Sequence, residues 1–209
     1  MRIGSFVRRM FGPYERQIAD AYRSIYIDIG SFVRVTHEWA PRANRILEVG
    51  CGEGAVTERL VMTYPESTIT AIDVTPRVGR LYRGPRGRVQ FTRCEVQAIA
   101  RSEPGQYDLV ILSDVLHHVP VALRQQLLDA VRTSMAPGGT FVFKEWEKRP
   151  SPIHCLAYAS DRWLTGDRVR YLTRKEMRGC LAATFGEAAL VAETRVGPWR
   201  NNIATLVRP

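Results

Sequence analysis

Residues 45–55 read RILEVGCGEGA, in which a short apolar run is followed at once by three glycines within five positions. The run RILEV has the length of a buried strand, and the following stretch AVTERLVMTY has the pattern of a helix. Glycine lets the backbone turn sharply and come close to a ligand. The stretch therefore predicts a strand, a tight turn and a helix, with a ligand bound at the turn.

Further apolar runs alternate with stretches of helical periodicity, at 68–73, 89–92, 108–113 and 140–143. Helices are expected after Pro76 and over 121–135 and 172–186, with Pro137-Gly138-Gly139 ending the second of them. This alternation predicts an α/β fold with a Rossmann-like doubly wound sheet, mostly parallel and buried on both faces. The last two extended segments, 187–196 and 201–208, predict a C-terminal hairpin that adds an antiparallel strand.

The length of 209 residues and the 45% share of hydrophobic residues fit one domain with one sizeable core. No apolar run approaches the roughly 20 residues that span a bilayer, and no signal-peptide segment is seen, so we expect a cytoplasmic protein. The four cysteines show no C-x-x-C spacing, which argues against a zinc site or a disulfide framework. We divide the chain into a helical cap (1–40), a cofactor-binding core (44–147), a lid (148–172) and a C-terminal helix with the hairpin (173–209).

The glycine turn by itself fits two kinds of ligand. Gly50, Gly52 and Ala55 satisfy the dinucleotide pattern G-x-G-x-x-G/A, and Asp73 could hold ribose hydroxyls in either case. A pyrophosphate at this turn would be repelled by Glu53 and by the nearby Glu48. S-adenosylmethionine carries a sulfonium, an ammonium and one carboxylate, so it suits these acids better. An NAD(P)-dependent oxidoreductase stays as the alternative.

Several motifs in order resemble a class I S-adenosylmethionine-dependent methyltransferase, of the kind found in quinone and secondary-metabolite methylation. They are LEVGCGEG at 47–54, AID ending at Asp73, YDLVILSDVLHHV at 107–119 and MAPGGTFVF at 135–143. Cys94 and Glu95 stand where the family usually has a Gly-Asp pair against the adenine, which weakens that match. The resemblance covers residues 44–147 strongly and the hairpin by topology. It implies S-adenosylmethionine bound by Glu48, Gly50, Cys51, Gly52, Asp73, Val74, Glu95, Val96 and Ser113.

The acceptor site is expected beyond the fourth strand, where His117 and His118 could supply a general base. The alternative is that these histidines only pack or cap the next helix, and His118 stands where the family commonly has histidine. Asp114 could serve the cofactor or cap the turn, and Glu145 is interpreted as a solvated acid. Aromatic residues of the lid could flank a ring-bearing acceptor or simply bury the lid: His154, Tyr158, Trp163 and Tyr171. We expect a small, hydrophobic or aromatic acceptor and no metal.

The net charge of +9 includes only three lysines among 30 basic residues, an arginine excess typical of a GC-rich genome. Residues 77–93 hold six arginines and no acid, which could contact RNA. A solvated surface is the preferred interpretation, because RNA methyltransferases usually add an RNA-binding domain for which this chain has no room. Residues 2–11 form an amphipathic basic pattern that could touch a membrane surface or cover the active site. The oligomeric state is not specified.

Overall fold

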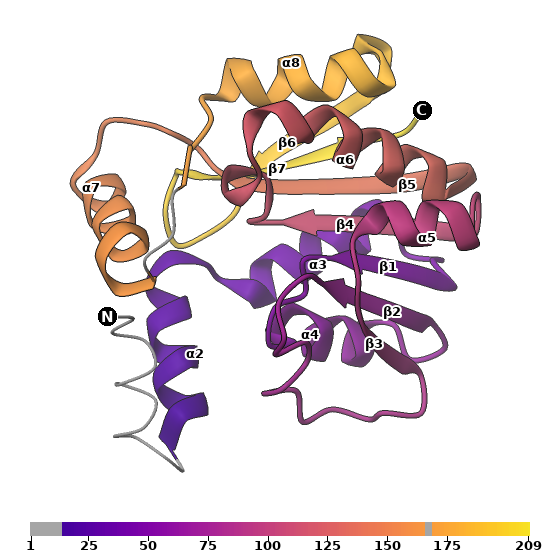
Figure 1. Cartoon of the computed structure of the whole chain (residues 1–209), viewed down its shortest axis with the longest axis horizontal. Helices are drawn as coiled ribbons and strands as arrows, with labels where there is room; N and C mark the ends of the chain where they lie inside the picture. The colour runs from indigo at the N-terminus through magenta and orange to yellow at the C-terminus, as the bar shows by residue number, and fades with distance from the viewer. Residues whose placement is uncertain (1–13, 166–168) are drawn as a thin grey trace.

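The computed structural model describes residues 14–165 and 169–209, and its centre is a seven-stranded sheet with strand order β3-β2-β1-β4-β5-β7-β6 (Figure 1). The first five strands are parallel. The strands are β1 (Arg45–Val49), β2 (Thr68–Asp73), β3 (Val89–Arg93), β4 (Tyr107–Ser113), β5 (Met135–Trp146), β6 (Leu190–Arg195) and β7 (Asn202–Val207). The expected Rossmann-like sheet is confirmed.

Both faces of the sheet are covered by helices, so successive residues of one strand are buried in two different hydrophobic clusters, one on each face. Ile46, Leu109 and Val142 pack with α3 (Ile29–Trp39) and α4 (Ala55–Thr63). Their neighbours Leu47, Val110 and Phe141 pack on the other face, against helices α5 (Val96–Ser102), α6 (Val121–Ser134) and α8 (Arg174–Phe185). Two-sided burial explains why the strands read as continuous apolar runs without polar alternation.

The order of the strands reverses between β1 and β4, which are neighbours although two strands separate them along the chain. Open α/β sheets bind ligands in the crevice at such a reversal, outside the carboxyl ends of the strands. The turns after β1, β2 and β4 all lie at this edge, so the fold brings the glycine turn, Asp73 and His117 to one place.

The C-terminal hairpin forms as expected, with β7 antiparallel to both β5 and β6. The antiparallel strand β7 is inserted between β5 and β6, so β6 forms the edge of the sheet. All six residues of β7 are buried, whereas β6 contains none that is fully buried. The hairpin therefore completes the core next to β5 and leaves the more polar strand at the rim.

Two expectations for the middle of the chain are wrong. No helix follows Pro76: residues 74–88 form turns, in which Gly79 has φ +62° and an added Cβ would lie 2.4 Å from Phe91. The Pro137-Gly138-Gly139 segment does not end a helix either, since α6 ends at Ser134 and β5 already begins at Met135. A register shift opposite Tyr107–Leu109 accommodates these extra residues within the ladder.

The N-terminal helix α2 (Glu15–Tyr26) lies apart from the sheet, next to α7 (Pro152–Ala159), and buries none of its residues fully (Figure 1). A small apolar cluster of Trp146, Ala157 and Tyr171, with Tyr26 against it, joins these helices to the end of β5. The amphipathic pattern at residues 2–11 lies outside the described residues. Among the residues that are described, no helix has the length and apolar character to cross a membrane.

Candidate functional site

The glycine turn after β1 is built by left-handed backbone and by hydrogen bonds to β2. Gly50, Gly52 and Gly54 have φ of 79°, 52° and 94°, values that favour glycine. The backbone N–H of Gly50 donates to the Ile72 carbonyl over 2.8 Å. A Cβ at Gly50 would collide with Val115 at 2.1 Å, whereas a Cβ at Gly52 would meet no atom within 4 Å. Gly50 is thus required by packing, and Gly52 faces open space that a ligand can fill.

Asp73 at the end of β2 is held rigidly beside this open space. One carboxylate oxygen accepts the N–H of Gly52 and the other accepts the N–H of Thr75, each over 2.8 Å. A cavity of about 730 Å³, which we call the large cavity, extends from here. Six residues that the resemblance predicts for cofactor binding line it, Gly50, Gly52, Asp73, Val74, Glu95 and Val96, and so does His118, which was predicted for the acceptor side. Val74 lines this cavity and is 61% exposed.

A second cavity of about 250 Å³, the turn cavity, lies on the other side of the glycine turn. It is lined by Glu48, Cys51 and Ser113, which were predicted, and by the start of α4. Glu48 is buried and accepts a hydrogen bond of 2.6 Å from the Thr57 hydroxyl. Burial, with a contribution from the charge of Asp73, raises the pKa of Glu48 to about 7. Burial also raises the pKa of the Cys51 thiol, which favours the protonated form of this side chain.

A third cavity of about 280 Å³, the histidine cavity, opens between β4, β5, α2 and α7. Its lining is aromatic and charged, and comprises Tyr22, Arg23, Tyr26, Ile27, Asp114, His117, His118, Lys144, Trp146, Ala157, Asp161, Tyr171 and Asn202. Asp114 lines this cavity, the turn cavity and the large cavity alike. The three cavities therefore meet at one side chain.

Asp114 is held in a strained position by a buried lysine. Its φ of 56° is in the left-handed region, which a non-glycine residue seldom adopts. The Lys144 ammonium, 1% exposed, lies 2.7 and 2.6 Å from the two carboxylate oxygens of Asp114. The Asp114 N–H also donates to the Lys144 carbonyl over 2.9 Å. Such over-determined strain is typical of functional positions.

His117 and Glu145 form a buried pair at the floor of the histidine cavity. Nδ1 of His117 lies 2.6 Å from one carboxylate oxygen of Glu145, and the other oxygen accepts the Leu116 N–H. The carboxylate can only accept, so Nδ1 donates and Nε2 keeps its lone pair when the ring is neutral. Burial alone lowers the pKa of His117, but the Glu145 charge outweighs it and places the pKa above the ordinary 6.5.

The interpretation of Glu145 as a solvated acid is therefore wrong, because this residue is 0% exposed. The sequence predicts that the fifth strand ends at Phe143, which leaves Glu145 beyond the strand. The strand in fact continues to Trp146, paired with β7 at every residue from Phe141 onwards. A buried histidine needs a hydrogen-bond partner, and this requirement points to an acid such as Glu145. The sequence, however, did not indicate that Glu145 is buried.

Among the described side chains of the expected lid, one aromatic side chain lines the histidine cavity. The Tyr171 ring stacks on His117 at 4.8 Å between centroids, and its hydroxyl donates to Asp161. His154 packs edge-on against Tyr171 and accepts the indole N–H of Trp146 over 3.0 Å. Tyr158 is 50% exposed and lies outside the cavity lining, and the Trp163 side chain lies outside the described residues.

One group could be considered for a metal ion. Asp114, His117 and Glu145 bring ligand atoms within 4.8 Å of one another. Both Asp114 oxygens already contact the Lys144 ammonium, and both Glu145 oxygens accept hydrogen bonds. Lys144 thus supplies the positive charge of this group, and a metal ion would have to displace it.

Three of the six arginines in the stretch 77–93 have guanidinium partners within the fold. Arg88 donates to three backbone carbonyls between α4 and β2, at 2.8 to 3.2 Å. Arg80 pairs with Glu15 and Glu53, and Arg93 donates to the Val74 carbonyl. Because these guanidinium groups already have partners, the stretch presents less free charge than the sequence indicates.

Comparison with known proteins agrees with this geometry. Residues 47–141 match the family model described as a methyltransferase domain. The trans-aconitate 2-methyltransferase of Streptomyces avermitilis is 32% identical over 173 residues, which is 78% of this chain and 62% of the relative. The ubiquinone biosynthesis O-methyltransferase of Xanthomonas campestris pv. campestris is 32% identical over 168 residues, covering 75% of this chain and 68% of the relative.

Solved structures show the same fold. The crystal structure of Burkholderia thailandensis 1,6-didemethyltoxoflavin-N1-methyltransferase, with bound 1,6-didemethyltoxoflavin and S-adenosylhomocysteine, superposes with a TM-score of 0.68. Its sequence is 19% identical, and the match covers 98% of this chain and 87% of that chain. Taken with the motifs and the site, these matches confirm the resemblance: the chain belongs to the class I S-adenosylmethionine-dependent methyltransferases.

Proposed function

We propose that this protein transfers the methyl group of S-adenosylmethionine to a small-molecule acceptor, and that the three cavities hold the two reactants. The large cavity takes the adenosine, with its ribose hydroxyls on Asp73, and the turn cavity takes the amino-acid end. The histidine cavity takes the acceptor. The observation that carries this assignment is that Asp114 lines all three cavities. The bound cofactor supplies an electrophilic methyl group at that junction.

The histidine cavity favours a small, planar acceptor. Its walls include Tyr26, Trp146 and Tyr171, whose rings offer flat apolar surface. Catalysis here rests on holding the acceptor in line with the methyl group and on excluding water, which such walls achieve. The names of the similar proteins cover a carboxylic acid, an oxygen and a ring nitrogen as acceptors, so the atom that is methylated is left to experiment.

His117 is proposed as the general base for an acceptor that carries a proton. Glu145 orients the ring through Nδ1, which leaves Nε2 to accept that proton. His118 is exposed and lines the mouth between the large and histidine cavities, so it is assigned to acceptor contact and not to proton transfer. The raised pKa of His117 means that activity increases with pH through a value above 6.5, as the imidazolium loses its proton.

Calorimetry tests the cofactor first. The protein should bind S-adenosylhomocysteine and should not bind NADH or NADPH, whereas the reverse result would support the oxidoreductase alternative. Phenols, carboxylic acids and nitrogen heterocycles, incubated with methyl-labelled S-adenosylmethionine, then report which acceptor class is turned over. Failure of every class to accept label from a protein that binds the cofactor would contradict the small-molecule proposal.

The base is tested on whichever acceptor is found. Glu145→Gln removes the charge that raises the pKa of His117, so the ascending limb of the kcat profile should move to lower pH. His117→Gln should remove that limb altogether. An unchanged profile in both variants would show that the pair only supports the packing of β4 against β5.

A further inference from the structure

The turn cavity has an uneven distribution of charge. Among the described residues that line it, Glu48, Glu53 and Asp114 are acids, and Arg23 is the cation. The amino-acid end of S-adenosylmethionine carries one ammonium and one carboxylate. The ammonium could pair with any of these three acids. The carboxylate has Arg23 as its charged partner.

The glycine turn itself offers few free donors to a carboxylate. The N–H groups of Gly50 and Cys51 both donate to the Ile72 carbonyl, at 2.8 and 3.0 Å. The N–H of Gly52 donates to Asp73, and that of Gly54 donates to the Cys51 carbonyl. These donors are therefore already satisfied, and an anion must be held from elsewhere. The first turn of α4, which also lines the cavity, is the competing source of donors.

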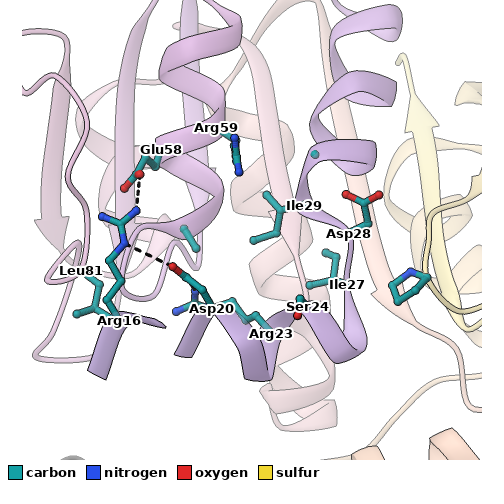
Figure 2. Close-up of a pocket in the computed structure, with 13 residues that line it drawn as sticks. Arg16, Asp20, Arg23, Ser24, Ile27, Asp28, Ile29, Glu58, Arg59 and Leu81 are labelled. Atoms are coloured by element: carbon teal, nitrogen blue, oxygen red, sulfur yellow. Dashed lines mark hydrogen bonds and ion pairs between the residues drawn. The ribbon is translucent and has the colours of Figure 1, made fainter. Parts of the chain in front are cut away.

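Arg23 comes from α2, outside the segment that matches the methyltransferase family model. Its Nη1 donates to Asp20 over 2.7 Å, and no hydrogen bond joins its Nε or Nη2 to another described residue. Arg23 lines the turn cavity, the histidine cavity and a fourth, outer cavity of about 440 Å³ between α2 and α4. Figure 2 shows it there, on the face of α2 that is turned toward α4.

We propose that the Arg23 guanidinium binds the carboxylate of the cofactor and thereby fixes α2 over the acceptor. This inference rests on the proposed function and goes beyond it, since it assigns the carboxylate to a helix outside the segment that matches the methyltransferase family model. The same helix presents Tyr22 and Tyr26 to the histidine cavity. Because α2 buries none of its residues fully, it packs loosely on the rest of the fold, and a bound carboxylate adds a contact that holds it. Cofactor binding thus fixes α2, which forms one wall of the histidine cavity.

Two ligands separate this contact from the rest of the cofactor site. S-adenosylhomocysteine has the carboxylate, whereas 5′-methylthioadenosine has the same adenosine and sulfur but lacks the amino-acid end. Arg23→Ala should weaken S-adenosylhomocysteine binding roughly 10- to 100-fold, as expected for charge-assisted hydrogen bonds. It should leave 5′-methylthioadenosine binding within about twofold of wild type. Arg23→Lys, which keeps the charge but not the planar fork, should lie between.

Arg16→Ala is the matched control. Arg16 lies two turns earlier on α2 and lines the outer cavity but not the turn cavity. It pairs with Glu58 over 2.6 Å, so its loss removes the same charge from the same helix without removing the proposed contact. This variant should bind both ligands as wild type does. Circular dichroism checks that each variant retains its helix content.

Amide hydrogen exchange gives a second measurement. In wild-type protein, S-adenosylhomocysteine should slow exchange over residues 15–26, and 5′-methylthioadenosine should not. Equal losses for both ligands in Arg23→Ala, or no loss for either, would overturn the assignment and leave the α4 N-terminus as the carboxylate site. If wild-type protein binds neither ligand, the proposed function itself is wrong, a result distinct from these.

Discussion

We propose that the Asp73 carboxylate combines a structural role with a role in binding the cofactor. Its two oxygens accept the N–H groups of Gly52 and Thr75, and each has a lone pair left for a ribose hydroxyl. Asp73→Asn keeps the shape but turns one acceptor into a donor that faces an N–H. We expect S-adenosylhomocysteine affinity to fall by at least tenfold, since each charge-assisted bond contributes about 1.5–3 kcal/mol. Calorimetry measures this loss.

Asp108 provides a control of the same chemistry at the opposite edge of the sheet. One of its oxygens accepts the N–H groups of Asn44 and Arg45, both over 2.9 Å. Asp108→Asn should lower the midpoint of urea unfolding but leave cofactor affinity unchanged. If both variants lose affinity equally, Asp73 acts only by stabilising the sheet.

Glu48 has a pKa of about 7 in the folded protein, against 4.5 as its ordinary value. The folded state therefore holds this proton more tightly than the unfolded state, and folding stability falls as pH rises from about 4.5 through 7. The full difference corresponds to roughly 3 kcal/mol. Glu48→Gln removes this cost, so the variant should be more stable than ligand-free wild type at pH 8 and similar at pH 5. Urea unfolding at the two pH values tests this.

The same charge should affect ligand binding in the opposite sense. An ammonium in the turn cavity favours ionised Glu48, so wild-type affinity for S-adenosylhomocysteine should rise from pH 6 to pH 8. In Glu48→Gln that dependence should be weaker. Parallel pH profiles for the two proteins would show that the cofactor ammonium lies away from Glu48.

At the scale of an element, we propose that the segment 148–172 contributes to the acceptor site through Tyr171. This side chain lines the histidine cavity but neither the large cavity nor the turn cavity. Tyr171→Ala removes the ring stacked on His117 and admits water, so turnover of the acceptor should fall at least tenfold while cofactor affinity stays the same. Steady-state kinetics and calorimetry together measure the two effects.

Tyr158 on α7 is the control for that prediction, because it is an aromatic residue of the same segment that is 50% exposed. Tyr158→Ala should change neither turnover nor cofactor affinity. A loss of cofactor affinity in Tyr171→Ala would contradict its assignment to the acceptor cavity alone.

At the scale of the whole molecule, the net charge of +9 raises the question of RNA binding. Arginines that already form hydrogen bonds within the fold would have to break them in order to bind RNA phosphates. We expect only non-specific binding of an RNA hairpin, with Kd no tighter than about 10⁻⁴–10⁻⁶ M at physiological salt. Fluorescence anisotropy measures it, and a Kd in the nanomolar range would support an RNA acceptor.

A comparison of Arg88 with Arg86 distinguishes an arginine that supports the fold from one that is solvated. Arg88→Gln removes three bonds to backbone carbonyls and should destabilise the protein by about 1–3 kcal/mol. Arg86→Gln, at an exposed position two residues earlier, should have little effect on unfolding. Equal effects would mean that the whole stretch is either solvated or structural.

Local sequence determined the sheet and the residues of the proposed cofactor side of the site. Strands β1, β2 and β4 are apolar runs that need no distant partner to be recognised, and the glycines after β1 permit a backbone that other residues disfavour. Asp73 follows from the same local logic, since it ends the strand next to the turn. Each of these features depends on residues that are close together in the sequence, so it can be recognised from the sequence alone.

On the proposed acceptor side, the sequence indicated His117 and Tyr171, but only the tertiary structure decided which charged residues are buried beside them. Glu145 and Lys144 are buried only because β7 returns from the end of the chain to pair with β5. Arg23 reaches the turn cavity because α2 lies over it, which no periodicity in α2 indicates. The same holds for the missing helix after Pro76, where side chains packed against Gly79 and bonds from Arg88 hold turns in place. Charged side chains have no period that predicts burial, because their burial depends on which distant partner neutralises them.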